Sequence, residues 1–334
     1  MHIFRMPVFF VLTGFFSALL LQRRGITSFI RNRCQRVLYP FIVFFCLMNV
    51  IRVTTLFLVT PHELDQIPGP TLFGIPLLAL GLTAHLWFLY LLLYFYSGTW
   101  LLTRLIGSSQ FPHPTISKVL VSPLALAGWV GLLALVLYGM PVATFFADGD
   151  LLLNWRIMLG YGLFYSFGWL LYQAQAIRQL WQRWAWPFLF AGVLIFIGYQ
   201  SLLPPITDGP NVAPSRQAQL SVLSAASSWL LGISFIGLFD RYVNQTHPTW
   251  QYFADASYWV YLIHVPICVW IQTLLIPVEA PALVKFGVVL LVTAFVSLLS
   301  YDLLVRGTAI GRWLNGRSEL PLWRQWFSAP VRVR

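Results

Sequence analysis

The sequence has 334 residues, of which 58% are hydrophobic, 17% are aromatic and only 9% are charged. So few charges cannot cover the surface of a soluble protein of this length, so the composition predicts an integral membrane protein. The formal net charge is +11, but the basic residues punctuate the apolar runs and form no single patch, and we expect no nucleic-acid partner. The three cysteines have neither metal-site nor disulfide-framework spacing, so no metal is expected.

Apolar runs of membrane-spanning length predict nine helices. They lie at approximately 6–22, 37–59, 85–103, 119–140, 156–177, 185–203, 218–238, 254–276 and 283–305. A further apolar segment, 71–83, contains Gly74 and Pro76 and is expected to lie in the membrane interface or to re-enter. The expected fold class is all-α, a polytopic transmembrane helix bundle over 1–310, followed by a basic cytoplasmic tail over 311–334.

The loops between these helices alternate in charge. The first carries no acidic residue and five arginines: Arg23, Arg24, Arg31, Arg33 and Arg36. The second carries Glu63 and Asp65 and no Lys or Arg. The positive-inside rule then places the odd-numbered loops and the C-terminal tail in the cytoplasm, and the N-terminus outside. Nine helices that begin outside are read as a ten-helix protein without its first helix.

A polar face is predicted on the apolar run 254–276. Ser257, Tyr261 and His264 are spaced four and three residues apart, so they share one side of a helix. An ionisable group at membrane depth usually faces the bundle interior, a partner or a water-filled cavity. We therefore expect these residues to line a pore. The alternative for His264 is a structural hydrogen bond to a backbone carbonyl that pins two helices.

Three more polar residues are predicted at the outer side. His2 and Arg5 share a face at the start of the first helix, and His85 opens the third, two residues before Trp87. Histidine transfers protons near neutral pH, and arginine can clamp a carboxylate or phosphate. His85 beside Trp87 is equally compatible with an interfacial anchor, and Arg5 with a side chain that extends to lipid headgroups.

Arg33 and Arg36 lie three residues apart at the mouth of the second helix. They are compatible with an anion-binding site for a cofactor and equally with simple orientation signals. Asp302, near the inner end of the last helix, is expected to be able to pair with a neighbouring arginine.

Four stretches of the sequence resemble motifs of the membrane acyltransferase 3 family. They are HIFRMPVFF with the following TGFF (2–16), RNRCQRVLYP (31–40), HLWFL (85–89) and ASYWVYLIHVP (256–266). They occur in the family's order and spread over most of the chain. Within the family, the pattern is similar to the glucan biosynthesis protein C branch, which adds succinyl groups to periplasmic glucans.

The resemblance implies about ten helices and transfer of an acyl group from a CoA thioester to a hydroxyl of a sugar or another acceptor. It also implies a catalytic histidine, with an arginine upstream of it, on a first helix that this sequence lacks, so no residue here is identified as the catalytic base by transfer. The expected protein is an O-acyltransferase of the bacterial inner membrane, embedded in the lipid bilayer, that moves an acyl group such as succinyl or acetyl. Acyl-CoA is its co-substrate, no cofactor is bound, and the acceptor is a periplasmic or cell-envelope glycan.

The candidate residues divide by role. Catalytic candidates are His264, His85, His2 and Arg5; Arg33 and Arg36 are expected to bind the anionic donor; Ser257, Tyr261 and Trp87 are expected to line the path. Two alternatives remain. One is a transporter or flippase for a glycan or lipid, although the two halves show no convincing internal repeat. The other is an inactive, truncated acyltransferase.

Overall fold

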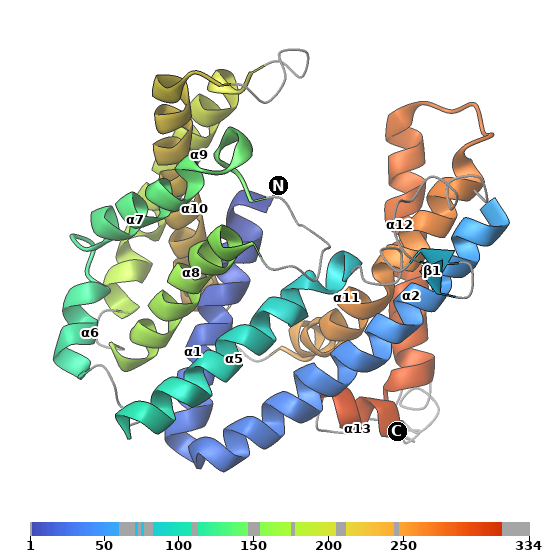
Figure 1. Cartoon of the computed structure of the whole chain (residues 1–334), viewed down its shortest axis with the longest axis horizontal. Coiled ribbons are helices and arrows are strands. Elements are labelled where there is room, and N and C mark those ends of the chain that lie inside the picture. Colours follow the sequence, from blue (N-terminus) through green and yellow to red (C-terminus); the bar gives the residue numbers. More distant parts are fainter. Residues whose placement is uncertain are drawn as a thin grey trace, which may run out of the picture. The chain divides into compact units, whose positions relative to one another are not determined.

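The computed structural model describes residues 2–59, 71–72, 75–76, 83–107, 113–145, 154–174, 178–204, 212–243 and 247–315. Helices make up nearly all of this part of the chain (Figure 1). Its strands are two short antiparallel segments, β1 (Thr71–Leu72) and β2 (Ile75–Pro76). The predicted all-α fold class is therefore confirmed.

The chain divides into two compact units, described here one at a time. Unit 1 comprises Met1–Arg31, Leu91–Asp148 and Leu152–Gln245, and unit 2 comprises Asn32–Tyr90, Gly149–Leu151 and Thr246–Arg334. The boundaries fall inside two helices, so α1 (His2–Arg33) and α5 (Trp87–Ile106) each contribute to both units.

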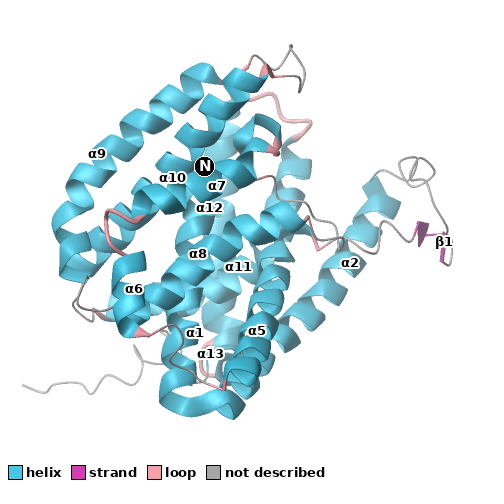
Figure 2. Ribbon diagram, turned by 60° about the vertical axis from the view of Figure 1, so that its left-hand side comes forward, coloured by secondary structure: helices cyan, strands magenta, loops and turns pink. Residues whose placement is uncertain are grey.

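Unit 1 is a bundle of helices (Figure 2). Besides most of α1 and α5 it contains α6 (Pro114–Leu120), α7 (Leu126–Tyr138), the 3-10 turn η3 (Pro141–Ala143), α8 (Trp155–Gln173), α9 (Arg178–Leu202) and α10 (Pro214–Tyr242). The α10 side chain Trp229 is buried against two α8 rings, with centroids 4.3 Å from Phe164 and 5.0 Å from Phe167.

Helices α1 and α8 approach each other closely because each places a glycine at the contact. A Cβ added to Gly14 would overlap the backbone carbonyl of Tyr165, and a Cβ added to Gly168 would overlap that of Val11. Small residues at a helix contact let the two backbones approach closely in a membrane bundle, where packing replaces the hydrophobic effect.

Unit 2 is formed around α11 and α12 together with the chain that follows α1. Its elements are the π-helical segment η1 (Cys34–Leu38), α2 (Tyr39–Val59), the 3-10 turn η2 (Ala84–Leu86), the first residues of α5, α11 (Pro248–Leu275), α12 (Ala282–Ser300), the π-helical segment η6 (Tyr301–Val305) and α13 (Ala309–Asn315). Trp259 on α11 donates a 3.0 Å hydrogen bond to the Ser300 hydroxyl on α12. Asp302 pairs with Arg306 at 3.7 Å, the arginine pairing that the sequence left open.

The segment expected as the first loop is helical. Helix α1 continues through the arginine-rich stretch to Arg33 and is interrupted only at Gly25, where φ is 73° and ψ is 175°. Glycine adopts positive φ without the steric cost of a Cβ, so the helix breaks at this residue and resumes after it. The expected loop was wrong because arginine is a good helix former, so a stretch rich in arginine can stay helical. Only Gly25 interrupts the helix there.

Six candidate spans in the described chain are long and apolar enough to cross a membrane. They are Ile3–Ile51, Trp87–Ile106, Gln179–Leu202, Pro214–Tyr242, Pro248–Leu275 and Ala282–Val305. The predicted span 6–22 and most of the predicted span 37–59 fall within the first of these, which is helical except at Gly25. The predicted span 119–140 contains only the 13-residue apolar helix α7, and 156–177 forms α8, which is not among the six.

Two sequence expectations fall mainly outside the described residues. They are the interfacial segment 71–83, described only at β1, β2 and Thr83, and the tail 311–334, described only as far as Asn315. The acidic residues of the second loop, Glu63 and Asp65, also lie outside the described chain. The orientation of the chain across the membrane stays a prediction.

Candidate functional site: a histidine pair on one turn of α11

One turn of α11 holds two imidazole rings in unit 2. His85, in the turn η2, lies 3.2 Å through its Nε2 from the carbonyl oxygen of Leu262. His264 bonds through its Nδ1 to carbonyls of its own helix, 2.8 Å from that of Tyr261 and 3.1 Å from that of Val260. The two rings, here called the histidine pair, have centroids 5.3 Å apart and planes inclined at 76°.

The acceptors decide which nitrogen of each ring carries hydrogen. A backbone carbonyl can only accept, so the nitrogen that faces it must donate. In its neutral form His85 is therefore protonated on Nε2 and has its lone pair on Nδ1, whereas a neutral His264 is protonated on Nδ1 and has its lone pair on Nε2. In that form each member of the pair keeps one ring nitrogen that can accept a proton.

His85 is held in the neutral state. His85 precedes the candidate span that begins at Trp87. Burial lowers the pKa of its imidazole to about 4. The hydrogen bond to Leu262 raises this pKa and the neighbouring His264 lowers it, but both effects are smaller than that of burial. Its Nδ1 is buried and has no hydrogen-bond partner among the described residues. A second proton would therefore have neither solvent nor an acceptor to stabilise it.

Tyr261 fixes the backbone that carries His85. Its hydroxyl donates a 2.7 Å hydrogen bond to the His85 carbonyl, and its ring centroid lies 5.7 Å from the His85 imidazole and 6.1 Å from Phe88. Tyr261 and Leu262 are consecutive, so two neighbouring residues of α11 hold the main chain and the ring of His85.

The basic segment after α1 is joined to the same helix. The hydroxyl of Tyr258 donates a 2.7 Å hydrogen bond to the carbonyl of Arg36, which lies in η1. Tyr258 precedes His264 by six residues, a rise of about 9 Å along a helix. The Arg36 side chain is exposed and that of Arg33 is half-buried. Arg33, Arg36 and the histidine pair all belong to unit 2.

The other predicted site residues lie outside this cluster or at its edge. Ser257 is exposed, and its hydroxyl donates to the Ala254 carbonyl of its own helix. Trp87 is buried at the start of α5. Arg5 is exposed on the unit 1 part of α1, and the His2 side chain is outside the described residues. The expected convergence of His2 and Arg5 with His85 stays a prediction.

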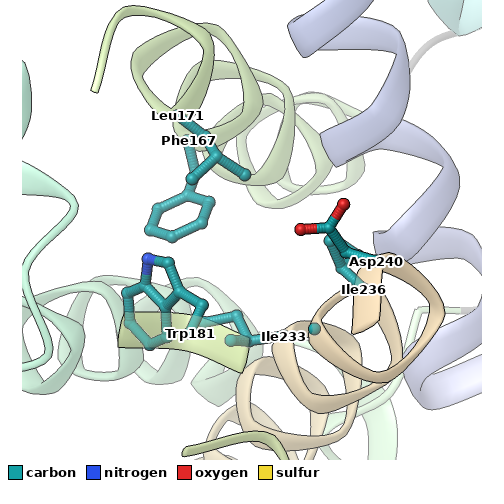
Figure 3. A pocket seen from close by; sticks show the side chains of 7 residues that line it. Phe167, Leu171, Trp181, Ile233, Ile236 and Asp240 are labelled. Atoms are coloured by element: carbon teal, nitrogen blue, oxygen red, sulfur yellow. The ribbon is translucent and has the colours of Figure 1, made fainter. Parts of the chain in front are cut away.

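Unit 1 contains a hollow of different character from the histidine pair (Figure 3). The residues that line it are Phe167, Leu171, Trp181, Ile233, Ile236, Gly237 and Asp240. Asp240 is its one acidic group, and that carboxylate already accepts a hydrogen bond from Gln182. The other lining residues are apolar or glycine, so Asp240 would have no second acid–base group beside it in this hollow.

Comparison with known sequences identifies the family. The profile described as an acyltransferase domain matches residues 1–302. The chain belongs to this acyltransferase family. The match includes η1, the η2 turn with His85 and the α11 turn with His264, so the family domain contains the whole cluster described above.

Curated relatives point in the same direction. The chain is 25% identical over 288 residues to proteins called glucans biosynthesis protein C from Escherichia coli O1:K1, strain K12 / DH10B and O157:H7. The similarity covers 83% of this chain and 72% of each relative. No solved structure matches the chain.

Sequence reasoning singled out His85, Tyr261 and His264 but not the backbone groups that hold them. The hydrogen bonds to Leu262 and Arg36 join residues 177 and 222 positions apart in the chain. The sequence did contain a signal for the hydrogen bond to Leu262. Pro266 stands four residues after Leu262 in the predicted helix and has no N–H to donate to the Leu262 carbonyl.

Proposed function

We propose that this membrane acyltransferase moves an acyl group from acyl-CoA to a hydroxyl of a cell-envelope glycan. The observation that carries the proposal is the histidine pair, in which each imidazole is anchored through one ring nitrogen to a backbone carbonyl of α11, so that its other nitrogen is not used in that bond. A neutral imidazole held in place is suited to accept a proton from a hydroxyl near neutral pH. We assign the role of general base to His264, because its ring is half-buried whereas the His85 Nδ1 is enclosed.

The reaction balances with this single base. The lone pair of His264 Nε2 takes the proton of the acceptor hydroxyl while the oxygen attacks the thioester carbonyl and forms the new C–O bond. The tetrahedral intermediate then breaks its C–S bond, and the thiolate of CoA leaves with the proton returned by the imidazolium. Products are an O-acyl ester and CoA with a free thiol. The Nδ1–H of His264 stays on the Tyr261 carbonyl throughout, which keeps the ring in place.

The donor is assigned to the arginine side of the unit. Acyl-CoA carries several phosphate charges, and guanidinium groups bind phosphates through paired hydrogen bonds. The Arg36 carbonyl accepts a hydrogen bond from Tyr258 on α11, and Arg33 precedes Arg36 by three residues, so a donor bound to these arginines would direct its thioester along α11 toward His264. Positive charge in this segment also agrees with a cytoplasmic position, in an inner membrane with a cytoplasmic C-terminus.

The name of the relatives supports a glycan acceptor. They are glucans biosynthesis proteins, and at 25% identity the same acceptor class is a proposal for this chain. His2 and Arg5 stay candidates from the sequence, at the end of α1 that the charge pattern places outside. Succinyl and acetyl groups are the acyl groups to test first.

The test is direct transfer in a defined membrane. The purified protein in lipid nanodiscs would be incubated with isotope-labelled succinyl-CoA or acetyl-CoA and a periplasmic glucan, and the glucan analysed by mass spectrometry. We expect one acyl mass per modified hydroxyl and an equal amount of free CoA thiol. A transporter or flippase would instead move unmodified glycan across a vesicle membrane, and an inactive chain would do neither.

A further inference from the structure

We propose that Pro266 is a positioning residue for His85, because the N–H that it lacks leaves the Leu262 carbonyl free to hold the His85 ring. The inference rests on the proposed function for its catalytic meaning, but its structural content can be tested without any substrate. It concerns one proline within α11, one carbonyl and one histidine from a distant turn.

The argument begins with the register of the helix. In an α-helix the N–H of each residue donates to the carbonyl four residues earlier, so the carbonyl of Leu262 is the regular acceptor for residue 266. That residue is Pro266, which has no N–H and lies inside α11. The proline ring also pushes against the same carbonyl and tilts it away from the helix axis.

A freed carbonyl at this depth needs another donor. Leu262 is fully buried, and a backbone carbonyl without a partner in such a position is unfavourable. The His85 Nε2 fills the place at 3.2 Å. The Leu262 carbonyl, which lacks its helical donor, therefore accepts from His85 in η2, although the two residues are 177 positions apart.

The consequence is a fixed tautomer. Because the Leu262 carbonyl can only accept, it keeps the hydrogen of His85 on Nε2 and leaves Nδ1 unprotonated next to His264. An alanine at 266 would restore the helical N–H and relax the tilt of the carbonyl. His85 would then share the Leu262 carbonyl with a helical N–H, its own hydrogen bond would weaken, and its two neutral tautomers would mix.

The experiment reads the tautomer by NMR of the full chain, labelled with 15N in the histidine rings and held in nanodiscs. The signals of His85 are identified by their loss in His85→Gln. Wild-type protein should show His85 protonated on Nε2 alone, and Pro266→Ala should show a mixture of tautomers. Pro187→Ala, which removes the proline inside α9 of unit 1, is the matched control and should leave the His85 signals unchanged.

A second variant separates the missing N–H from the ring. A 2-hydroxy acid placed at position 266 has neither an N–H nor a proline ring, and it should keep the wild-type tautomer even if Pro266→Ala fails to fold. A wild-type His85 protonated on Nδ1, an unchanged tautomer in Pro266→Ala, or a mixture in the hydroxy-acid variant would each overturn the proposal. If acyl transfer is found, kcat of Pro266→Ala should fall about tenfold, as when partners that set a histidine tautomer are lost elsewhere. Absence of acyl transfer by the wild-type protein would contradict the proposed function but would not change what the NMR experiment says about the tautomer of His85.

Discussion

The hydroxyl of Tyr261 and the backbone carbonyl of His85 are joined by a hydrogen bond of 2.7 Å. The next residue along α11, Leu262, accepts from the ring of the same histidine. His85 is therefore held at two points by two consecutive residues. This double attachment makes the position of one imidazole depend on a single turn of a helix that also carries the other.

Tyr261→Phe tests the main-chain half of this attachment. Loss of the hydroxyl leaves the His85 carbonyl without its donor, and a polar group stranded in this way costs about 1–3 kcal/mol of stability. We expect a lower midpoint of thermal unfolding in nanodiscs and a reduced kcat. The matched control is Tyr242→Phe, which removes an exposed hydroxyl that accepts from Trp186 at 3.2 Å and should change the midpoint little. Equal midpoints for the two variants would contradict the assigned role of Tyr261.

Arg33→Ala combined with Arg36→Ala tests the donor site. Removal of two guanidinium groups should raise the apparent KM for acyl-CoA and leave kcat nearly unchanged, because the groups bind phosphates away from the reacting carbonyl. The control is Arg241→Ala, which removes a basic side chain of unit 1 that lies over the ring of Tyr242. An unchanged KM in the double variant would return both arginines to the role of orientation signals.

Gly14→Ala tests the close contact of α1 with α8. The added methyl group would overlap the Tyr165 carbonyl, and forced overpacking typically costs about 1–3 kcal/mol. Thermal unfolding should show the loss. Gly98→Ala, in α5, meets no atom within 4 Å and should be neutral or raise stability by about 0.5–1 kcal/mol through helix propensity. A stable Gly14→Ala variant would show that the two backbones do not touch at this point.

The sequence was sufficient for the fold class and for the approximate course of most long helices. Apolar length sets these features, so α5, α9, α10, α11 and α12 lie near their expected ranges. The sequence predicted a loop where α1 continues, because a cluster of charges marks the end of a membrane span but does not say whether the backbone there is helical. Gly25 alone interrupts the helix in that stretch.

The candidate site was predictable only in part. The spacing of Tyr261 and His264 follows from helical periodicity, which is local in the chain. Their contacts with His85 depend on the Leu262 carbonyl, which lacks a helical donor, and on the turn η2, which brings His85 to it. Helical periodicity is local and does not predict a contact between residues 177 positions apart. Ser257 shares the expected spacing yet bonds to its own backbone, as serine hydroxyls in helices often do.

The central claim is that His264 is the base of acyl transfer, and the most direct measurement compares transfer rates of wild type, His264→Gln and His247→Gln in nanodiscs with saturating acyl-CoA. His247 is the exposed residue that caps α11, where its Nδ1 accepts from the Thr249 N–H, so its replacement should leave the rate within about twofold. Removal of a general base should lower kcat by about 10²–10⁴-fold with the KM for acyl-CoA largely preserved. A His264→Gln variant that transfers acyl groups at the wild-type rate would contradict the account.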